Sequence, residues 1–174
     1  MVITNILRYL LFFAGLLLLQ VVVIDPIDLG RFITPILYVT LVMVLPANIK
    51  PWALLVISFV AGIIADTFSD TGGMHAFSLV CTAYVRNYLL PLFLSKDDAE
   101  KPIEPTLFTL GYRMFFFYAA SLTFVYHLVF TFLDEATLSN FFASMGTVLV
   151  STLVAVVLIF LLQLLLYRTK PQEA

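Results

Sequence analysis

The sequence predicts an all-α membrane protein that crosses the bilayer six times. Of its 174 residues, 62% are hydrophobic and 11% are charged, whereas a soluble domain is roughly half apolar and about a quarter charged. The mean hydropathy is correspondingly high, at +1.07. The apolar residues form six runs near the roughly 20 residues that a helix needs to span a hydrocarbon core. We therefore expect a single integral membrane domain over residues 1–174.

The first predicted helix covers residues 6–24. Arg8 before an apolar run resembles the start of a secretory signal, but the run continues through Val21–Ile24 without a small-residue cleavage site. We expect this segment to stay in the protein as its first span. The second predicted helix, 32–45, is short, and residues 46–51 alone separate it from the third. The second and third helices should therefore form a tight hairpin.

The third and fourth predicted helices cover residues 52–68 and 74–94. Between them, Ser69–Gly73 combines glycines with side chains that favour turns, which predicts a sharp reversal. These two helices should be antiparallel neighbours. The most polar stretch, 95–106, follows them and must lie in water.

The fifth and sixth predicted helices cover residues 107–133 and 138–167. We expect His127, in the aromatic fifth helix, to be an interfacial residue. The sixth helix carries small residues at every fourth position, a pattern that allows close contact with another helix: Ala143, Thr147, Ser151 and Ala155.

The distribution of basic residues predicts cytoplasmic N- and C-termini, because cytoplasmic loops carry an excess of Lys and Arg. With that orientation, Arg31 is external and Arg86 lies within the fourth helix. The basic residues at the cytoplasmic side are then Arg8, Lys50, Lys96, Lys101, Arg113, Arg168 and Lys170. We expect a multi-pass protein of the bacterial cytoplasmic membrane.

Polar residues form one stripe on each of the third and fourth predicted helices. Helical spacing places Ser58, Gly62 and Asp66 on one face of the third. It likewise places four residues on one face of the fourth: His75, Ser78, Thr82 and Arg86. Since a short turn joins the helices, the stripes should face each other or a shared interior.

Asp66 and His75 should lie at similar depth, with Arg86 about 16 Å further in, so an ion pair between Asp66 and Arg86 is not expected. We expect Asp66 to brace the Ser69–Gly73 turn, with His75 nearby. Contact of Asp66 or His75 with a partner or ligand stays open, as does contact of Arg86 with a partner or lipid headgroup.

The sequence does not predict an enzyme. It contains no nucleophilic serine elbow and no phosphate-binding glycine loop, and Asp66 and Asp70 are poorly placed for an aspartyl dyad. One cysteine and two histidines predict no metal site, and no basic aromatic patch suggests nucleic acid. We expect no catalytic residue, cofactor or metal.

One set of residues resembles the MreD family of rod shape-determining proteins, with the best match over residues 32–90. The resemblance is carried by Thr34-Pro35-Ile36-Leu37-Tyr38, by Leu45-Pro46 before a basic residue, by Gly62 and Asp66 four residues apart, and by Ser69, Gly73 and His75-Ala76. The candidate structural or partner-binding residues are Pro35, Pro46, Ser58, Gly62, Asp66, Gly73, His75, Ser78, Thr82 and Arg86.

This resemblance implies a non-enzymatic scaffold of the bacterial elongation complex (elongasome). Such a protein would bind MreC and, through it, associate with MreB, RodA and a class B penicillin-binding protein, directing lateral peptidoglycan synthesis and cell shape. The family is also similar to the S components of energy-coupling-factor transporters. The alternative is therefore a transporter component that binds a vitamin-type small molecule, although bulky aromatics over residues 115–118 would tend to fill such a pocket.

Overall fold

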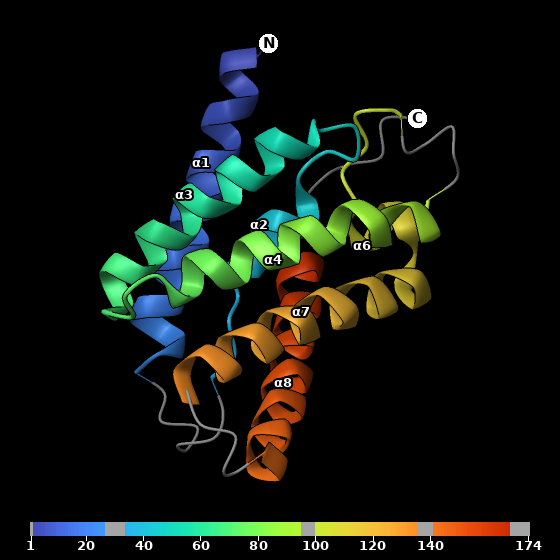
Figure 1. Cartoon of the computed structure of the whole chain (residues 1–174). Coiled ribbons are helices and arrows are strands. Elements are labelled where there is room, and N and C mark those ends of the chain that lie inside the picture. The colour runs from blue at the N-terminus through green and yellow to red at the C-terminus, as the bar shows by residue number, and fades with distance from the viewer. Residues whose placement is uncertain (1, 27–33, 95–99, 136–140, 168–174) are drawn as a thin grey trace.

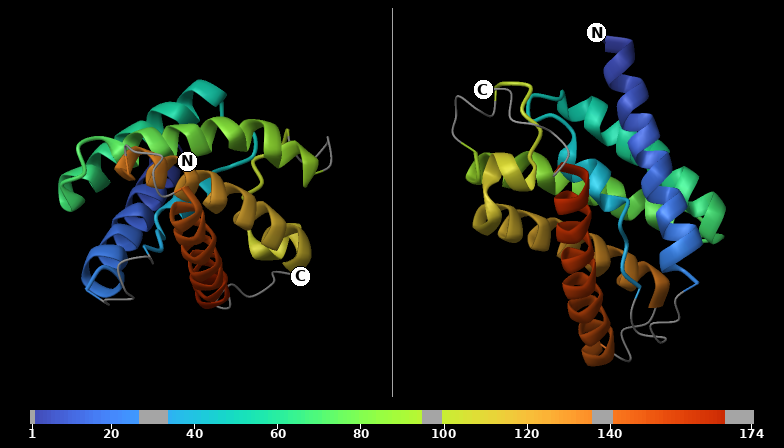
Figure 2. Two further views of the ribbon diagram at one scale, coloured as in Figure 1. Left: turned by 60° about the horizontal axis from the view of Figure 1, so that its bottom comes forward. Right: turned by 180° about the vertical axis from the view of Figure 1, so that it is seen from behind.

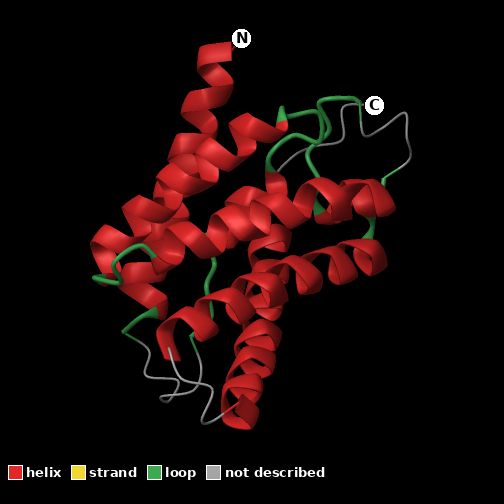
Figure 3. Cartoon of the chain, in the orientation of Figure 1, coloured by secondary structure: helices red, strands yellow, loops and turns green. Residues whose placement is uncertain are grey.

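The computed structural model describes residues 2–26, 34–94, 100–135 and 141–167, and all regular secondary structure in these ranges is helical (Figures 1 and 3). Four helices are long and apolar enough to cross a membrane, which agrees with an all-α membrane protein. The elements are α1 (Val2–Leu19), the π-helix η1 (Gln20–Ile24), α2 (Val39–Val44), α3 (Pro51–Ser69), α4 (Met74–Leu89), the 3-10 helix η2 (Leu90–Leu92), α6 (Leu107–Leu110), α7 (Tyr112–Glu135) and α8 (Phe141–Tyr167).

The second predicted span is not the continuous helix that the sequence predicts. Residues 34–37 form no regular secondary structure, and α2 provides fewer than two helical turns before Leu45 adopts an extended conformation. Proline disfavours helical backbone in the residue before it, which accounts for the breaks at Thr34-Pro35 and Leu45-Pro46. An extended residue advances the chain about 3.3 Å and a helical residue about 1.5 Å, so this short segment still covers considerable depth.

We call residues 34–46 the central segment, because the other helices surround it. Helices α3, α4 and α7 lie side by side, and α8 crosses α7 steeply (Figure 1). Seen from behind, α2 lies between α1 and α8 (Figure 2). Each α2 residue is at most 4% exposed. Irregular backbone at membrane depth requires such burial within protein.

Helices α3 and α4 form the antiparallel pair that the sequence predicts. Pro51 occupies the first turn of α3, where its missing N–H costs nothing. The helix ends at Asp70, which is left-handed at φ 54°, and Gly73 at φ 100° precedes α4. At the crossing, Gly62 lies directly against the backbone of Ala76. Close approach of the two helices therefore depends on glycine at this position.

The fifth predicted helix is divided, contrary to the prediction of one helix over 107–133. Gly111 adopts φ 77° and ψ 159°, which interrupts the helix between α6 and α7. Thr106 and Thr109 form a reciprocal capping box at the start of α6. In α8 the predicted small-residue ridge is buried at Ser151 and Ala155, whereas its first member is exposed.

Candidate functional site

The non-helical start of the central segment is held by Gln20, which is 3% exposed. Its Nε2 donates to the carbonyl oxygen of Pro35 (3.0 Å), and its Oε1 accepts from the N–H of Leu37 (2.9 Å). Nε2 also lies 2.7 Å from Oδ1 of Asp25. A single amide thus supplies the donor and the acceptor that a neighbouring strand would otherwise provide.

Thr34 is held from the opposite side by α7 and α8. Its carbonyl oxygen accepts from Nε2 of His127 (3.1 Å), and its N–H donates to Oγ of Ser151 (3.1 Å). The Nδ1 atom of His127 lies 2.9 Å from the carbonyl oxygen of Thr123. Since His127 is only 1% exposed, the expectation of an interfacial residue is wrong.

Tyr38, His75 and Tyr126 form a buried triangle of polar groups in the middle of the fold. Nδ1 of His75 lies 2.6 Å from the Tyr38 hydroxyl and 2.5 Å from the Tyr126 hydroxyl, and the two hydroxyls are 3.1 Å apart. The ring of Phe130 stacks on His75 with centroids 4.6 Å apart. This triangle joins the central segment to α4 and α7.

Arg86 binds the other end of the central segment and is 1% exposed. Its guanidinium donates to the carbonyl oxygens of Leu45 and Pro46, and its Nε donates to the Tyr118 hydroxyl (3.1 Å). Tyr118 in turn donates to the carbonyl oxygen of Met43 (3.0 Å). Helix C-termini expose unpaired carbonyls and carry partial negative charge, so a cation here is well placed. No described carboxylate lies within ion-pair distance of Arg86.

Asp66 braces the α3–α4 turn, as the sequence predicts. Its Oδ1 accepts from the Thr71 hydroxyl (2.6 Å) and from the N–H of His75 (2.9 Å), and its Oδ2 accepts from the N–H of Ala76 (2.9 Å). These contacts satisfy free N–H groups in the first turn of α4, where a negative charge is also favourable. The described contacts of Asp66 therefore fix the α3–α4 turn to the start of α4.

The α3 stripe packs against the start of α4 through Gly62 and Asp66, whereas the α4 stripe faces an interior shared with the central segment and α7. Ser78 and Thr82 are buried and donate to carbonyls one turn earlier in their own helix, at 2.7 and 2.8 Å. On α3, the hydroxyl of Ser58 is buried and lacks a partner among the described residues. Of the ten candidates, the structure thus brings Asp66, Gly73 and His75 together, joins Gly62 to the start of α4, and joins Arg86 to Pro46.

Several residues of this network are not among the candidates that the sequence suggests. Gln20 and His127 each carry a polar group within an apolar helix, and this is the signal that could have found them. The hydroxyls of Tyr118 and Tyr126 could not be assigned inward from composition, because tyrosine also suits membrane interfaces. The described residues contain no group of three His, Cys, Asp or Glu side chains that could hold a metal.

Two apolar grooves lie between α1 and α3. The larger, of about 570 Å³, runs along α1 and reaches Ile64 and Phe68 of α3. The smaller, of about 260 Å³, has Leu41 and Leu45 of the central segment in its wall. All the side chains that line them are hydrophobic, Tyr9 with its single hydroxyl included.

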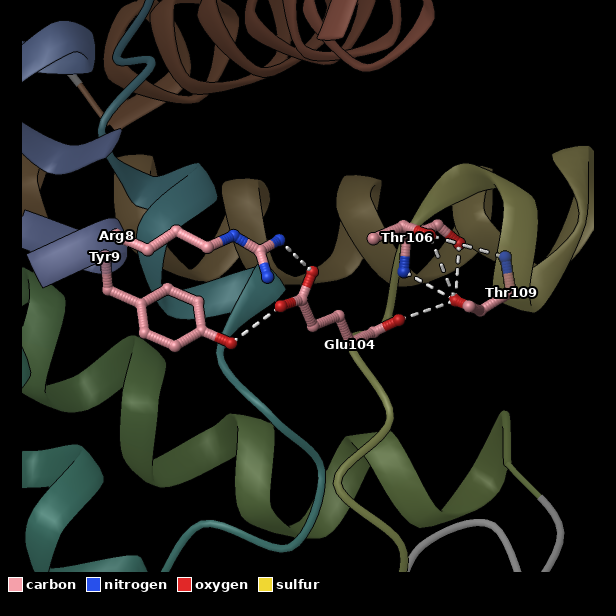
Figure 4. A network of polar contacts seen from close by, with 5 residues as sticks. All are labelled: Arg8, Tyr9, Glu104, Thr106 and Thr109. Carbon is pink, nitrogen blue, oxygen red and sulfur yellow. Dashed lines mark hydrogen bonds and ion pairs between the residues drawn. The ribbon is translucent and has the colours of Figure 1, made fainter. Parts of the chain in front are cut away.

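Near these grooves, polar contacts tie the N-terminal part of α1 to the segment before α6 (Figure 4). Arg8 forms an ion pair with Glu104 at 2.8 Å, and the Tyr9 hydroxyl donates to the same carboxylate at 2.7 Å. The backbone of Glu104 accepts from Thr109 (2.7 Å), which links this contact to the capping box of α6. We call the contact of Arg8 and Tyr9 with Glu104 the latch.

Comparisons of the chain with models of protein families, with curated proteins and with solved structures found no match. Gln20, His127 and Arg86 bind the chain's own backbone at the two ends of the central segment. This arrangement can fix a buried, irregular segment in one conformation and leave an apolar outer surface.

Proposed function

We propose that this chain is a non-enzymatic membrane scaffold of the MreD type, with six membrane passes and cytoplasmic termini, in the bacterial cytoplasmic membrane. It binds an MreC-like protein and, through it, associates with MreB, RodA and a class B penicillin-binding protein. Its work is to position these proteins during lateral wall synthesis.

One observation carries the scaffold proposal. Five buried polar side chains that could have lined a ligand pocket bind the central segment instead: Gln20, His127, Ser151, Arg86 and Tyr118. A small-molecule site usually presents a few convergent polar groups in an apolar lining. The two grooves have apolar linings without such a group. A fixed interior with an apolar exterior suits the binding of other membrane proteins.

The proposed topology is supported by contacts between loops. The N–H of Ala47 donates to the carbonyl oxygen of Ile103 (2.8 Å), and Arg8 reaches Glu104. The N-terminal part of α1, the α2–α3 connection and the segment before α6 thus lie near one another, as three segments on one side of the membrane should. The second pass in this topology is the central segment rather than a full helix.

The test is purification of the tagged chain from native membranes after cross-linking, followed by mass spectrometry. Recovery of an MreC-like protein with wall-synthesis enzymes supports the proposal, and depletion of the chain should produce rounded cells. A matched sample carrying an unrelated tagged six-pass protein controls for non-specific capture. Co-purification of a pair of ATPases with a bound vitamin, together with normal cell shape after depletion, would establish the transporter alternative.

A further inference from the structure

The N-terminal helix α1 is the least enclosed of the four candidate spans. In the window Leu7–Ile24, 28% of residues are buried, compared with 33–39% in the other three windows. In α1 itself, Phe13, Leu16 and Leu17 are the buried described residues. The N-terminal end of α1 rises clear of the remaining helices in both views that show it from the side (Figures 1 and 2). The buried side chains of α1 that the structure describes thus lie in its C-terminal half.

The C-terminal end of α1 is built as a pivot. Residues Gln20–Ile24 form a π-helical turn, closed by the N–H of Asp25 donating to the carbonyl oxygen of Gln20 (2.8 Å). Such turns interrupt the regular helix and often occur where a helix bends or functions. The same turn is anchored, because Gln20 binds Pro35 and Leu37 of the central segment. This end of α1 stays in place while the helix above it has freedom to tilt.

The N-terminal part of α1 is held by the latch. The side chain of Arg8 is 49% exposed and that of Glu104 is 16% exposed. The guanidinium of Arg8 is open to water and salt, which weaken an ion pair. The latch is therefore a contact that thermal motion or a competing charge can release.

The grooves between α1 and α3 provide space into which α1 can tilt. Leu10 and Phe13 of α1 line both grooves, opposite Ile64 of α3. Within a membrane, helices associate through close van der Waals packing. A released α1 that tilts across the grooves would gain such packing against α3.

We propose that α1 is a hinged gate: it pivots at the π-helical turn Gln20–Ile24, the latch holds it away from α3, and release of the latch lets it close over the grooves. This inference concerns the fold alone and does not depend on which partner the protein binds. The grooves lined by Leu10, Phe13 and Ile64 are open in one position of α1 and filled in the other.

Distance measurements between spin labels in lipid nanodiscs test the gate. Cys81 is first replaced by serine. One label pair, Leu7→Cys with Phe59→Cys, reports the N-terminal end of α1; a second, Val23→Cys with Ile63→Cys, reports the pivot. All four positions are exposed and lie outside the groove linings.

The latch is removed in two independent ways, by Glu104→Ala and by Arg8→Gln with Tyr9→Phe. The control is Tyr112→Phe with Arg113→Gln, which changes the same two residue types at an exposed site at the start of α7. We expect both latch variants to add a shorter-distance population to the Leu7–Phe59 pair and to leave the Val23–Ile63 pair unchanged. The control should change neither pair.

Three outcomes would overturn the gate. Unchanged distances at the Leu7–Phe59 pair would show that the latch does not set the position of α1. Equal shifts at both pairs would show that the π-helical turn is no pivot. A shift in the control as large as that in the latch variants would show general loosening. Because two latch variants are used, failure of either one to fold leaves the test intact.

Discussion

Replacing Gly62 by alanine tests how closely α3 and α4 approach each other. A Cβ atom added at Gly62 would lie 2.7 Å from the backbone nitrogen of Ala76 and 3.0 Å from the carbonyl carbon of His75, whereas ordinary contact begins at 3.4 Å. The obstructing atoms are backbone, so no change of rotamer can make room. The Cα atom of Ala76 lies closer still, so the two helices must separate by about 1 Å, and the N–H groups of His75 and Ala76 would be drawn away from Asp66.

Overpacking of this kind costs typically about 1–3 kcal/mol. Alanine recovers about 0.5–1 kcal/mol of that, because it loses less backbone entropy than glycine in a helix. We expect a net loss of about 1–2 kcal/mol in the free energy of unfolding, which lowers the ratio of folded to unfolded protein by a factor of about 5–30.

The assay is unfolding of the detergent-solubilised protein by sodium dodecyl sulfate, followed by circular dichroism. Gly15→Ala in α1 and Gly146→Ala in α8 are matched controls, since an added Cβ meets nothing within 4 Å at either position. Both should be neutral or slightly stabilising. If Gly62→Ala unfolds at the same detergent fraction as these controls, the close contact between α3 and α4 is refuted.

Three further substitutions test the polar network. Asp66→Asn removes the charge and one acceptor from the cap of α4. It should lower the free energy of unfolding by about 1–2 kcal/mol and reduce the yield of monodisperse protein. An unchanged yield would contradict the bracing role. Arg86→Gln and Tyr118→Phe should each destabilise the protein. Because both side chains bind the end of α2, the loss of stability in the double variant should differ from the sum of the two single losses by about 0.5 kcal/mol or more. Strict additivity in the unfolding assay would count against a shared network. Gln20→Leu leaves two buried backbone groups unpaired and should lower the free energy of unfolding by about 1–3 kcal/mol. The control Gln163→Leu removes a buried amide without a described partner and should be neutral or stabilising. Equal losses of stability in the two variants would show that the described bonds of Gln20 contribute nothing.

Composition was sufficient to predict the class of the protein, and the turn-forming residues Ser69–Gly73 predicted the antiparallel α3–α4 pair. The turn around Asp66 was also predictable, because glycines, turn-forming side chains and a carboxylate occur within a few residues of one another. These features are local in the sequence, and local spacing determines them.

The central segment could not be predicted in the same way. Hydropathy reports how apolar a segment is, and Thr34–Leu45 is apolar whether it is helical or extended. Its conformation is instead determined by side chains distant in the sequence, such as Gln20, His127 and Arg86, which satisfy its backbone. The break at Gly111 was missed because an isolated glycine is also tolerated within a helix.

The dependence of the central segment on distant side chains has a consequence for biogenesis. A helix as short as α2 is not stable on its own, and the unpaired backbone groups around it are costly in hydrocarbon. Two of its anchors, Arg86 and His127, are synthesised after it, and Ser151 comes later still, on α8. The central segment, although it is synthesised early, is therefore among the last parts of the chain to acquire its final conformation. Until α8 has been synthesised and has packed, the insertion machinery or the lipid interface must protect the unpaired backbone groups of the central segment.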